Sequence, residues 1–222
     1  MSNKPVAVLD TLKFKDGKIF LKKFHIQRTY EALAFKKINV SLDNVTLFYN
    51  LIEEETAIRI KPDQILRISI PITSESGQAF EYSFDPVRDL ARGSQVEILD
   101  APYFSQAPKL VIHIKDRRPS GIGEKNFKWV DSDFWQKLLA QKNTNVDDII
   151  AINDKDQMTE TSRCNILFFD SSKDLVLTPS LDSGCLNGVY RRFIMSQGTV
   201  QLPDLGHKKV IEENLSFFEL NK

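Results

Sequence analysis

The stretch of sequence that decides the fold is MTETSRCNILF, residues 158–168. Before it lies the apolar run 148–153, which is followed by the polar turn 154–156. Short apolar runs bounded by turn residues are typical of strands, so we expect strands over 148–153 and 165–169. Glu160 lies between these strands, and two interpretations of it are open: a carboxylate at the solvent edge of a strand, or an acid that binds a ligand.

The chain on either side of this stretch predicts more strands and two helices. Residues 175–178 are expected to form a strand, and a helix is expected from about Asn187 to the residue before Gly198. Glycine is common just after a helix because it adopts positive φ without strain. A further helix is expected over about 131–142, with Phe134, Trp135 and Leu138 facing inward.

The N-terminal part alternates hairpins with helices. Asp16-Gly17 lies between two short strand-like runs and is a strong signal for a two-residue hairpin turn. One helix is expected with Ile26, Tyr30 and Leu33 on a single apolar face. A second helix starts near Ser41 or Asp43, and its predicted core positions are Val45, Phe48, Leu51 and Ile52.

After this helix the pattern changes to a period of two, which indicates strands. Residues 65–72 alternate, with 80–84 as the expected hairpin partner, and further strands are expected over 95–99 and 109–114. The predicted domains are an N-terminal lobe over 1–115, an interdomain loop over 116–127 and a C-terminal lobe over 128–222. The predicted fold class is α+β.

Composition limits the classes of function. The chain has 222 residues, and its 30 Lys and Arg balance its 30 Asp and Glu, so no net field attracts nucleic acid or an anionic membrane. Its apolar runs are too short to span a bilayer, and residues 1–6 lack the apolar core of a secretory signal. Cys164 and Cys185, with three histidines, show no spacing for a disulfide framework or a metal site. We therefore expect a cytoplasmic protein without metal, nucleic-acid or membrane partners.

Several residues together meet the needs of a cofactor that has a phosphate, a pyridine ring and an aldehyde. The helix start at residues 187–190 offers backbone amides to a phosphate, and Gly188 allows a close approach. A lysine in a dry pocket can bind an aldehyde, and a carboxylate such as Glu160 can pair with the ring nitrogen. Taken singly these features are common, because most lysines lie on the surface and most such glycines serve turns.

In this order, the features resemble those of a known family. Residues 158–168 resemble the signature of the class IV aminotransferases, the fold-type IV pyridoxal-phosphate enzymes. Thr178-Pro179 with residues 186–191 resembles the family's phosphate segment, and residues 24–28 resemble its His-x-x-Arg helix. Residues 117–122 resemble the interdomain loop. The resemblance implies a two-lobed fold like that of D-amino acid aminotransferase, with an α/β N-terminal lobe and a β-rich C-terminal lobe with helices.

The resemblance also implies roles for individual residues. Lys128 is the lysine that binds pyridoxal 5'-phosphate covalently, because residues 127–131 resemble the family's Lys-x-x-Asn/Asp pattern. Lys128 precedes Glu160 by 32 residues, close to the family's usual separation. Lys125, three residues earlier, is a rival for this role. Glu160 pairs with the pyridine nitrogen and keeps it protonated.

The phosphate and the substrate have their own expected partners. Arg28 holds the phosphate together with the amides of Val189 and Tyr190, unless it is only an exposed helix arginine. Arg117 is the candidate for binding a substrate carboxylate, and Arg67 and Arg118 could also meet one; surface or structural roles are equally open for all three.

Two reactions within the family use the same lysine and glutamate. The compact size and the His-Ile-Gln-Arg segment favour 4-amino-4-deoxychorismate lyase, which eliminates pyruvate and leaves 4-aminobenzoate for folate biosynthesis. The alternative is a branched-chain or D-amino acid aminotransferase, and both act on a small amino-acid-like substrate. A degenerate, non-catalytic member is the second alternative, because Asp10, Ser132 and Asn187 replace the family's usual residues. The resemblance also implies a homodimer.

Overall fold

The computed structural model describes residues 6–61, 64–72, 95–100, 109–129 and 133–216. The chain splits into two compact units: unit 1 is Met1–Tyr103 with Lys128–Asp131, and unit 2 is Phe104–Phe127 with Ser132–Lys222. This division differs from the predicted one in two ways. The predicted interdomain loop belongs to unit 2, because β5 (Leu110–Arg118) runs into it and pairs with β6 (Asp148–Asn153). Lys128 belongs to unit 1, because its backbone carbonyl accepts a hydrogen bond from the N–H of Leu9 at 2.8 Å.

The described residues of unit 1 form a sheet and two helices. Its elements are β1 (Val6–Lys15), β2 (Lys18–Ile19), α1 (Lys22–Phe35), α2 (Leu42–Thr56), β3 (Gln64–Ile72) and β4 (Gln95–Asp100). The described strands form a sheet in the order β2-β1-β3-β4, with antiparallel pairing throughout. The predicted turn is confirmed, since Asp16 and Gly17 have φ of 52° and 72°, the positive values that this hairpin turn requires. The predicted partner strand 80–84 lies outside the described residues.

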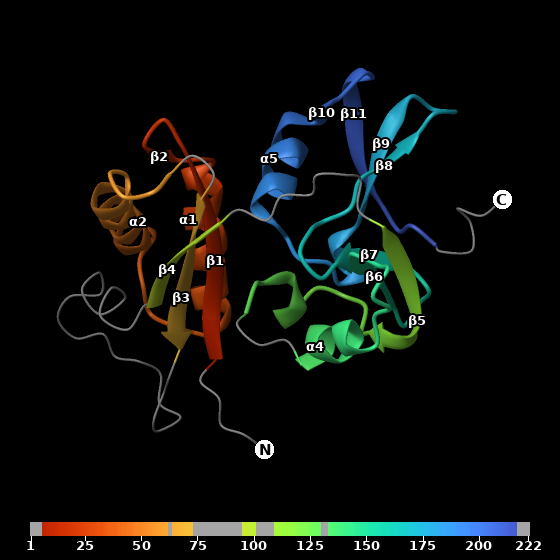
Figure 1. The fold of residues 1–222 in the computed structure, drawn as a ribbon, viewed down its shortest axis with the longest axis horizontal. Helices are drawn as coiled ribbons and strands as arrows, with labels where there is room; N and C mark the ends of the chain where they lie inside the picture. The colour runs from red at the N-terminus through yellow and green to blue at the C-terminus, as the bar shows by residue number, and fades with distance from the viewer. Residues whose placement is uncertain (1–5, 62–63, 73–94, 101–108, 130–132, 217–222) are drawn as a thin grey trace. The chain divides into compact units, whose positions relative to one another are not determined.

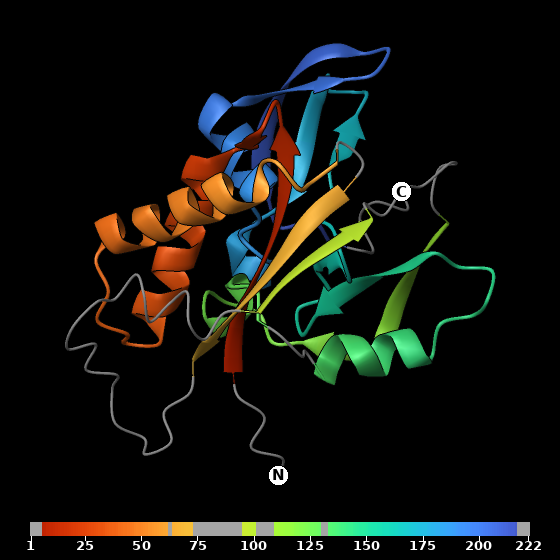
Figure 2. The same ribbon diagram turned by 60° about the vertical axis from the view of Figure 1, so that its left-hand side comes forward.

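The helices α1 and α2 cover the same face of this sheet (Figure 1, Figure 2). The buried positions alternate along the strands, and Leu12 in β1 lies opposite Leu66 in β3, both fully buried. The cap of α2 is confirmed, because the Ser41 side chain accepts a hydrogen bond from the N–H of Asn44 at 3.1 Å. One predicted core position is wrong: Leu51 is 44% exposed, while the other three predicted core residues of α2 are buried.

The described residues of unit 2 form two sheets and two helices. After β5 its elements are η1, a 3₁₀ turn (Glu124–Asn126), α4 (Asp133–Ala140), β6, β7 (Met158–Thr161), β8 (Phe168–Asp170), β9 (Leu175–Pro179), η2 (Leu181–Ser183), α5 (Val189–Gln197), β10 (Thr199–Leu202) and β11 (Gly206–Glu213). The described strands form one sheet in the order β5-β6-β7 and another in the order β10-β11-β9-β8. The predicted strand over 148–153 is confirmed as β6.

Apolar side chains join these layers within unit 2. Ile152 of β6, Met158 of β7 and Leu177 of β9 belong to one core cluster that both sheets share. Leu138 packs α4 against β6, and Ile194 packs α5 against the other sheet. Fully burying one such side chain contributes roughly 1.5–3 kcal/mol. In the described part of the chain, no helix has the length and apolar character needed to cross a membrane.

One strand starts later than predicted. The sequence predicts a strand over 165–169, but β8 begins at Phe168. Residues 161–164 form a tight turn, in which the Thr161 N–H donates to the Cys164 carbonyl at 2.9 Å. Asn165 then leaves the sheet pattern because its side-chain amide donates to the carbonyl of Leu186 at 2.8 Å.

Candidate functional site

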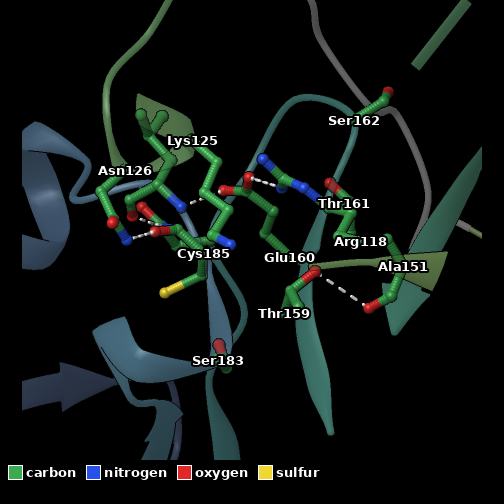
Figure 3. Close-up of polar contacts among 12 residues, drawn as sticks. Arg118, Lys125, Asn126, Ala151, Thr159, Glu160, Thr161, Ser162, Ser183 and Cys185 are labelled. Carbon is green, nitrogen blue, oxygen red and sulfur yellow. Dashed lines mark hydrogen bonds and ion pairs between the residues drawn. The ribbon is translucent and has the colours of Figure 1, made fainter. Parts of the chain in front are cut away.

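The central acid of unit 2 is Glu160, in β7. Its side chain is buried, which excludes the interpretation of a carboxylate at the solvent edge of a strand. One carboxylate oxygen, Oε2, accepts a hydrogen bond from the backbone N–H of Leu186 at 2.9 Å. The other oxygen, Oε1, accepts a hydrogen bond from Arg118 and forms an ion pair with it (Figure 3). A charged group this far from solvent needs such partners, because burial penalises an unpaired charge.

The segment before α5 is held by two residues of the 158–168 stretch. Glu160 accepts a hydrogen bond from the Leu186 N–H, and Asn165 donates one to the Leu186 carbonyl. Both backbone polar groups of Leu186 are therefore held by side chains of this stretch. Gly188 follows two residues later and lies against Asn165. A Cβ atom at this position would collide with the Asn165 side-chain oxygen. The signature stretch therefore shapes the entrance to α5, which explains why Glu160, Asn165 and Gly188 occur together.

The N-terminus of α5 can bind an anion. Gly188 is its N-cap, with extended backbone angles and no side-chain cap, so no side chain of the cap covers the first amides. Val189 and Tyr190 are the first two helical residues, and the first N–H groups of a helix have no acceptor within the helix. Together with the helix dipole, such amides favour a phosphate or a carboxylate. The predicted anion-binding segment therefore has suitable backbone geometry.

Arg118 lies at the end of β5, opposite Asn153 of β6. Its guanidinium carbon is 5.4 Å from the ring centroid of Phe134 and 5.5 Å from that of Trp135, both in α4. Cation–π contacts of this kind hold a guanidinium in place. The sequence suggests Arg118 only for a substrate carboxylate, and no local pattern could have found its pairing with Glu160, 42 residues away.

Lys125, the rival lysine, lies in η1 of unit 2. Its ammonium donates to the carbonyl of Pro119 and to that of Ser120, the latter at 2.6 Å. Burial and, next, the Arg118 charge lower the pKa of Lys125, while Asp154 opposes this shift. The neighbouring Asn126 connects η1 to the loop before α5, because its side-chain amide donates to the Cys185 carbonyl at 2.6 Å (Figure 3).

Lys128 lies in unit 1 and extends the pairing of β1. Its ammonium donates to the Thr11 hydroxyl at 3.1 Å, and the next residue, Trp129, forms an antiparallel bridge with Val8. The side chain of Lys128 is half-buried. Asp131, which completes the motif around this lysine, lies outside the described residues. The lysine is thus held by the strand that also carries Asp10.

Arg28 is buried in a polar cluster of unit 1, so the interpretation of an exposed helix arginine is wrong. Its guanidinium forms an ion pair with Asp10. Both Asp10 oxygens lie 2.9 Å from Nδ1 of His25, and the Tyr49 hydroxyl donates to one of them. Burial raises the pKa of Asp10, but Arg28 and His25 outweigh it and bring the pKa well below its ordinary value. The resemblance identifies Asp10 as a replacement, but it does not predict this cluster.

Two of the three arginines suggested for a substrate carboxylate, Arg117 and Arg67, are exposed. Arg117, in β5, is exposed and forms an ion pair with Asp156 in the turn after β6. Arg67, in β3, is exposed. In unit 1, a hollow of about 640 Å³ lies beside the β1–β2 hairpin. None of the predicted site residues lines it.

Each unit, taken by itself, offers groups that suit a part of a pyridine aldehyde phosphate. Unit 2 supplies a buried carboxylate next to the segment that leads into helix amides, with a glycine where a larger residue would collide. Unit 1 supplies a half-buried lysine amine and a buried arginine. These are the chemical types that the ring nitrogen, the phosphate and the aldehyde require.

Comparison with known proteins identifies relatives of this sequence. Residues 7–222 match the family described as Amino-transferase class IV. No curated protein matches the sequence by direct comparison.

Solved structures share the fold. The 4-amino-4-deoxychorismate lyase of Pseudomonas aeruginosa aligns with a TM-score of 0.69 at 11% identity, covering 96% of this chain and 75% of its own. A hypothetical aminotransferase of Mycobacterium tuberculosis, with α-ketoglutarate and PMP bound, aligns with a TM-score of 0.69 at 14% identity, covering 96% and 73%. The branched-chain amino acid aminotransferase of Escherichia coli aligns with a TM-score of 0.65 at 17% identity, covering 98% and 70%. The predicted α+β, fold-type IV architecture is therefore confirmed.

Proposed function

Because this chain belongs to the class IV aminotransferases, a family of pyridoxal-phosphate enzymes, we propose that it carries pyridoxal 5'-phosphate on Lys128 and pairs the pyridine nitrogen with Glu160. The observation that carries the proposal is the position of Glu160. Its buried carboxylate accepts from the Leu186 N–H at 2.9 Å, two residues before the glycine that caps α5. One segment of chain thus connects a candidate partner for the ring nitrogen with a candidate partner for the phosphate.

Each residue has a defined task in this proposal. The Lys128 amine would bind the cofactor until an incoming substrate amine displaces it, and the freed amine would then accept the proton from the substrate's α-carbon. When bound, the cofactor supplies an electron sink that stabilises negative charge at that carbon. Glu160 accepts a hydrogen bond from the protonated ring nitrogen. Thr11 accepts a hydrogen bond from the Lys128 ammonium and so orients it.

The phosphate is assigned to the amides of Val189 and Tyr190, with Arg28 as the cation. Its ion pair with Asp10 restricts Arg28 to one orientation within the cluster of unit 1. Arginine suits the role because its planar guanidinium matches phosphate oxygens. Arg117 remains a candidate for a substrate carboxylate, and its partner Asp156 is the group that a substrate has to displace.

For the reaction, we propose a lyase like 4-amino-4-deoxychorismate lyase, which releases pyruvate and 4-aminobenzoate. The similarity of fold to the Pseudomonas aeruginosa lyase supports this choice. Transamination is the second candidate, supported by the same kind of similarity to the two aminotransferases. Two assays separate them. Aminodeoxychorismate should yield pyruvate, and an amino acid with 2-oxoglutarate should yield no glutamate; the reverse result supports the aminotransferase.

Cofactor binding is tested by reconstituting the purified protein with pyridoxal phosphate and recording its visible absorbance. We expect an absorbance that borohydride bleaches, that Lys128→Ala lacks and that the matched variant Lys125→Ala keeps. A protein without any such absorbance contradicts the proposal and supports a non-catalytic role. We also propose a homodimer, and light scattering that gives the mass of a single chain contradicts it.

A further inference from the structure

Arg118 and Glu160 form an ion pair in which both side chains are largely buried. The exposed fractions of their side chains are 11% and 7%. Figure 3 shows the two side chains extending toward each other from separate strands. The position of Arg118 is fixed independently of Glu160, because its backbone pairs with β6 and its guanidinium lies against two rings of α4. Contacts other than its ion pair with Glu160 therefore hold Arg118 in place within unit 2.

Other titratable groups surround the pair. Arg191 in α5 and Cys185 in the loop before it interact electrostatically with Glu160, and Lys125 in η1 interacts with Arg118. Burial raises the pKa of Cys185, so its thiol stays neutral at physiological pH. Arg191 is itself paired with Glu212. Among these described groups, Arg118 is the cation that hydrogen-bonds directly to the Glu160 carboxylate.

A carboxylate buried without a cation takes up a proton, because a low-dielectric environment disfavours the charged form. Only an ionised carboxylate can stabilise a protonated ring nitrogen, since a protonated acid has no charge to offer. We propose that Arg118 is a positioning residue that keeps Glu160 ionised and fixes the direction of its carboxylate. The role of Glu160 toward the ring nitrogen rests on the proposed function, but the stability test of Arg118 needs no cofactor.

The geometry also explains why the cation is an arginine. Its guanidinium donates to Glu160 while its central carbon lies 5.4 Å and 5.5 Å from the two ring centroids. A lysine ammonium is a compact point charge and does not offer the same extended planar group to the carboxylate and the rings together. We therefore expect Arg118→Lys to keep Glu160 ionised but to hold its direction less well.

The test is a cycle of four cofactor-free proteins: wild type, Arg118→Met, Glu160→Gln and the double variant. Without Arg118, Glu160 binds a proton more tightly in the folded than in the unfolded state. That stabilising contribution is present at low pH and is lost as the pH rises above the ordinary glutamate value of about 4.3. The Tm deficit of Arg118→Met against wild type should therefore grow between about pH 5 and pH 8. For a chain of this size, each tenfold gain in the proton affinity of Glu160 should add about 3–5 °C to the deficit.

The Glu160→Gln background is the matched control, because glutamine has the same shape and cannot titrate. In this background the Tm deficit that Arg118→Met causes should stay constant with pH. Any loss of Tm that comes from lost packing appears in both backgrounds. A deficit that is independent of pH in both backgrounds overturns the proposal. If Arg118→Met does not fold, Arg118→Gln takes its place with the same expectation.

A second readout connects the pair to the cofactor. The affinity for pyridoxal phosphate, followed by absorbance, should fall about tenfold or more in Arg118→Met at about pH 8, and Arg118→Lys should restore most of it. Equal affinity in all three proteins overturns the role toward the ring nitrogen. A wild type that binds no cofactor refutes the proposed function, while the stability cycle still decides the role of Arg118.

Discussion

In each unit of this protein a buried carboxylate pairs with a buried arginine, Asp10 with Arg28 and Glu160 with Arg118, but the two carboxylates have different surroundings. Asp10 of unit 1 accepts hydrogen bonds from the side chains of Arg28 and His25 in α1 and of Tyr49 in α2. Glu160 of unit 2 accepts from Arg118 and from a backbone N–H of the loop before α5. The first acid joins helices to a sheet, and the second orients a loop.

The difference shows how a similar ion pair can serve stability or a binding site. Asp10 is fully buried, and its partners come from both helices, so its loss affects the core of unit 1. Glu160 is 5% exposed and its backbone partner leads directly into the N-terminus of a helix, where a ligand can bind. We therefore expect changes around Asp10 to lower stability most and to affect the cofactor through Arg28, and changes around Glu160 to alter mainly cofactor binding.

The largest effect is expected for Asp10→Ala. This change leaves the Arg28 charge and the Tyr49 hydroxyl buried without their acceptor, which costs about 3–5 kcal/mol of the free energy of unfolding. Urea denaturation measures it. Asp43→Ala is the control because Asp43 is exposed in α2 of the same unit, and a loss of equal size in both variants contradicts the account.

The pH dependence of stability gives a second test of Asp10. Arg28 and His25 hold the pKa of Asp10 well below its ordinary value. An acid with a lowered pKa stabilises the folded state above its unfolded value of about 3.9, and this contribution is lost as the pH falls through the folded value. Wild type should therefore lose stability in acid below about pH 4, and Asp10→Asn should lose less over that range. Thermal unfolding at a series of pH values measures both, and equal losses in the two proteins contradict the expectation.

A smaller effect is expected for Gly188→Ala, which changes the segment before α5 in unit 2. The added Cβ collides with the Asn165 side chain, so Asn165 has to move away from Leu186, at a cost of about 1–3 kcal/mol. Cofactor affinity should fall with it. Gly123→Ala is the control, since nothing lies within 4 Å of a Cβ placed there. Unchanged affinity in Gly188→Ala contradicts the role of this segment.

The smallest effect is expected for Tyr49→Phe. It removes one donor from Asp10 and one partner from Thr29, whose hydroxyl lies 2.7 Å from that of Tyr49, and should cost about 1–2 kcal/mol. Thermal unfolding measures it, with the exposed Tyr190→Phe as control. Cofactor affinity should hardly change. A loss of affinity without a loss of stability contradicts this expectation.

The sequence predicts local features of this molecule well. Alternation over residues 65–72 identified β3, and Asp16-Gly17 identified the hairpin, because both signals depend on neighbouring residues. The strand expected at 165 failed because Asn165 bonds to Leu186, 21 residues later in the chain. The partners of Lys128 and Glu160 are separated from them by 117 and 42 residues. Such pairings depend on how strands assemble, and no local spacing encodes them.

The central claim is that Lys128 carries the cofactor, and one measurement tests it most directly. The protein is reconstituted with pyridoxal phosphate, reduced with borohydride, digested and mapped by mass spectrometry. We predict that the pyridoxyl group is found on Lys128, and that Lys125, whose ammonium donates to two carbonyls of its own loop, stays unmodified. Modification of Lys125 in place of Lys128, or a reduced protein without any pyridoxyl group, contradicts the account.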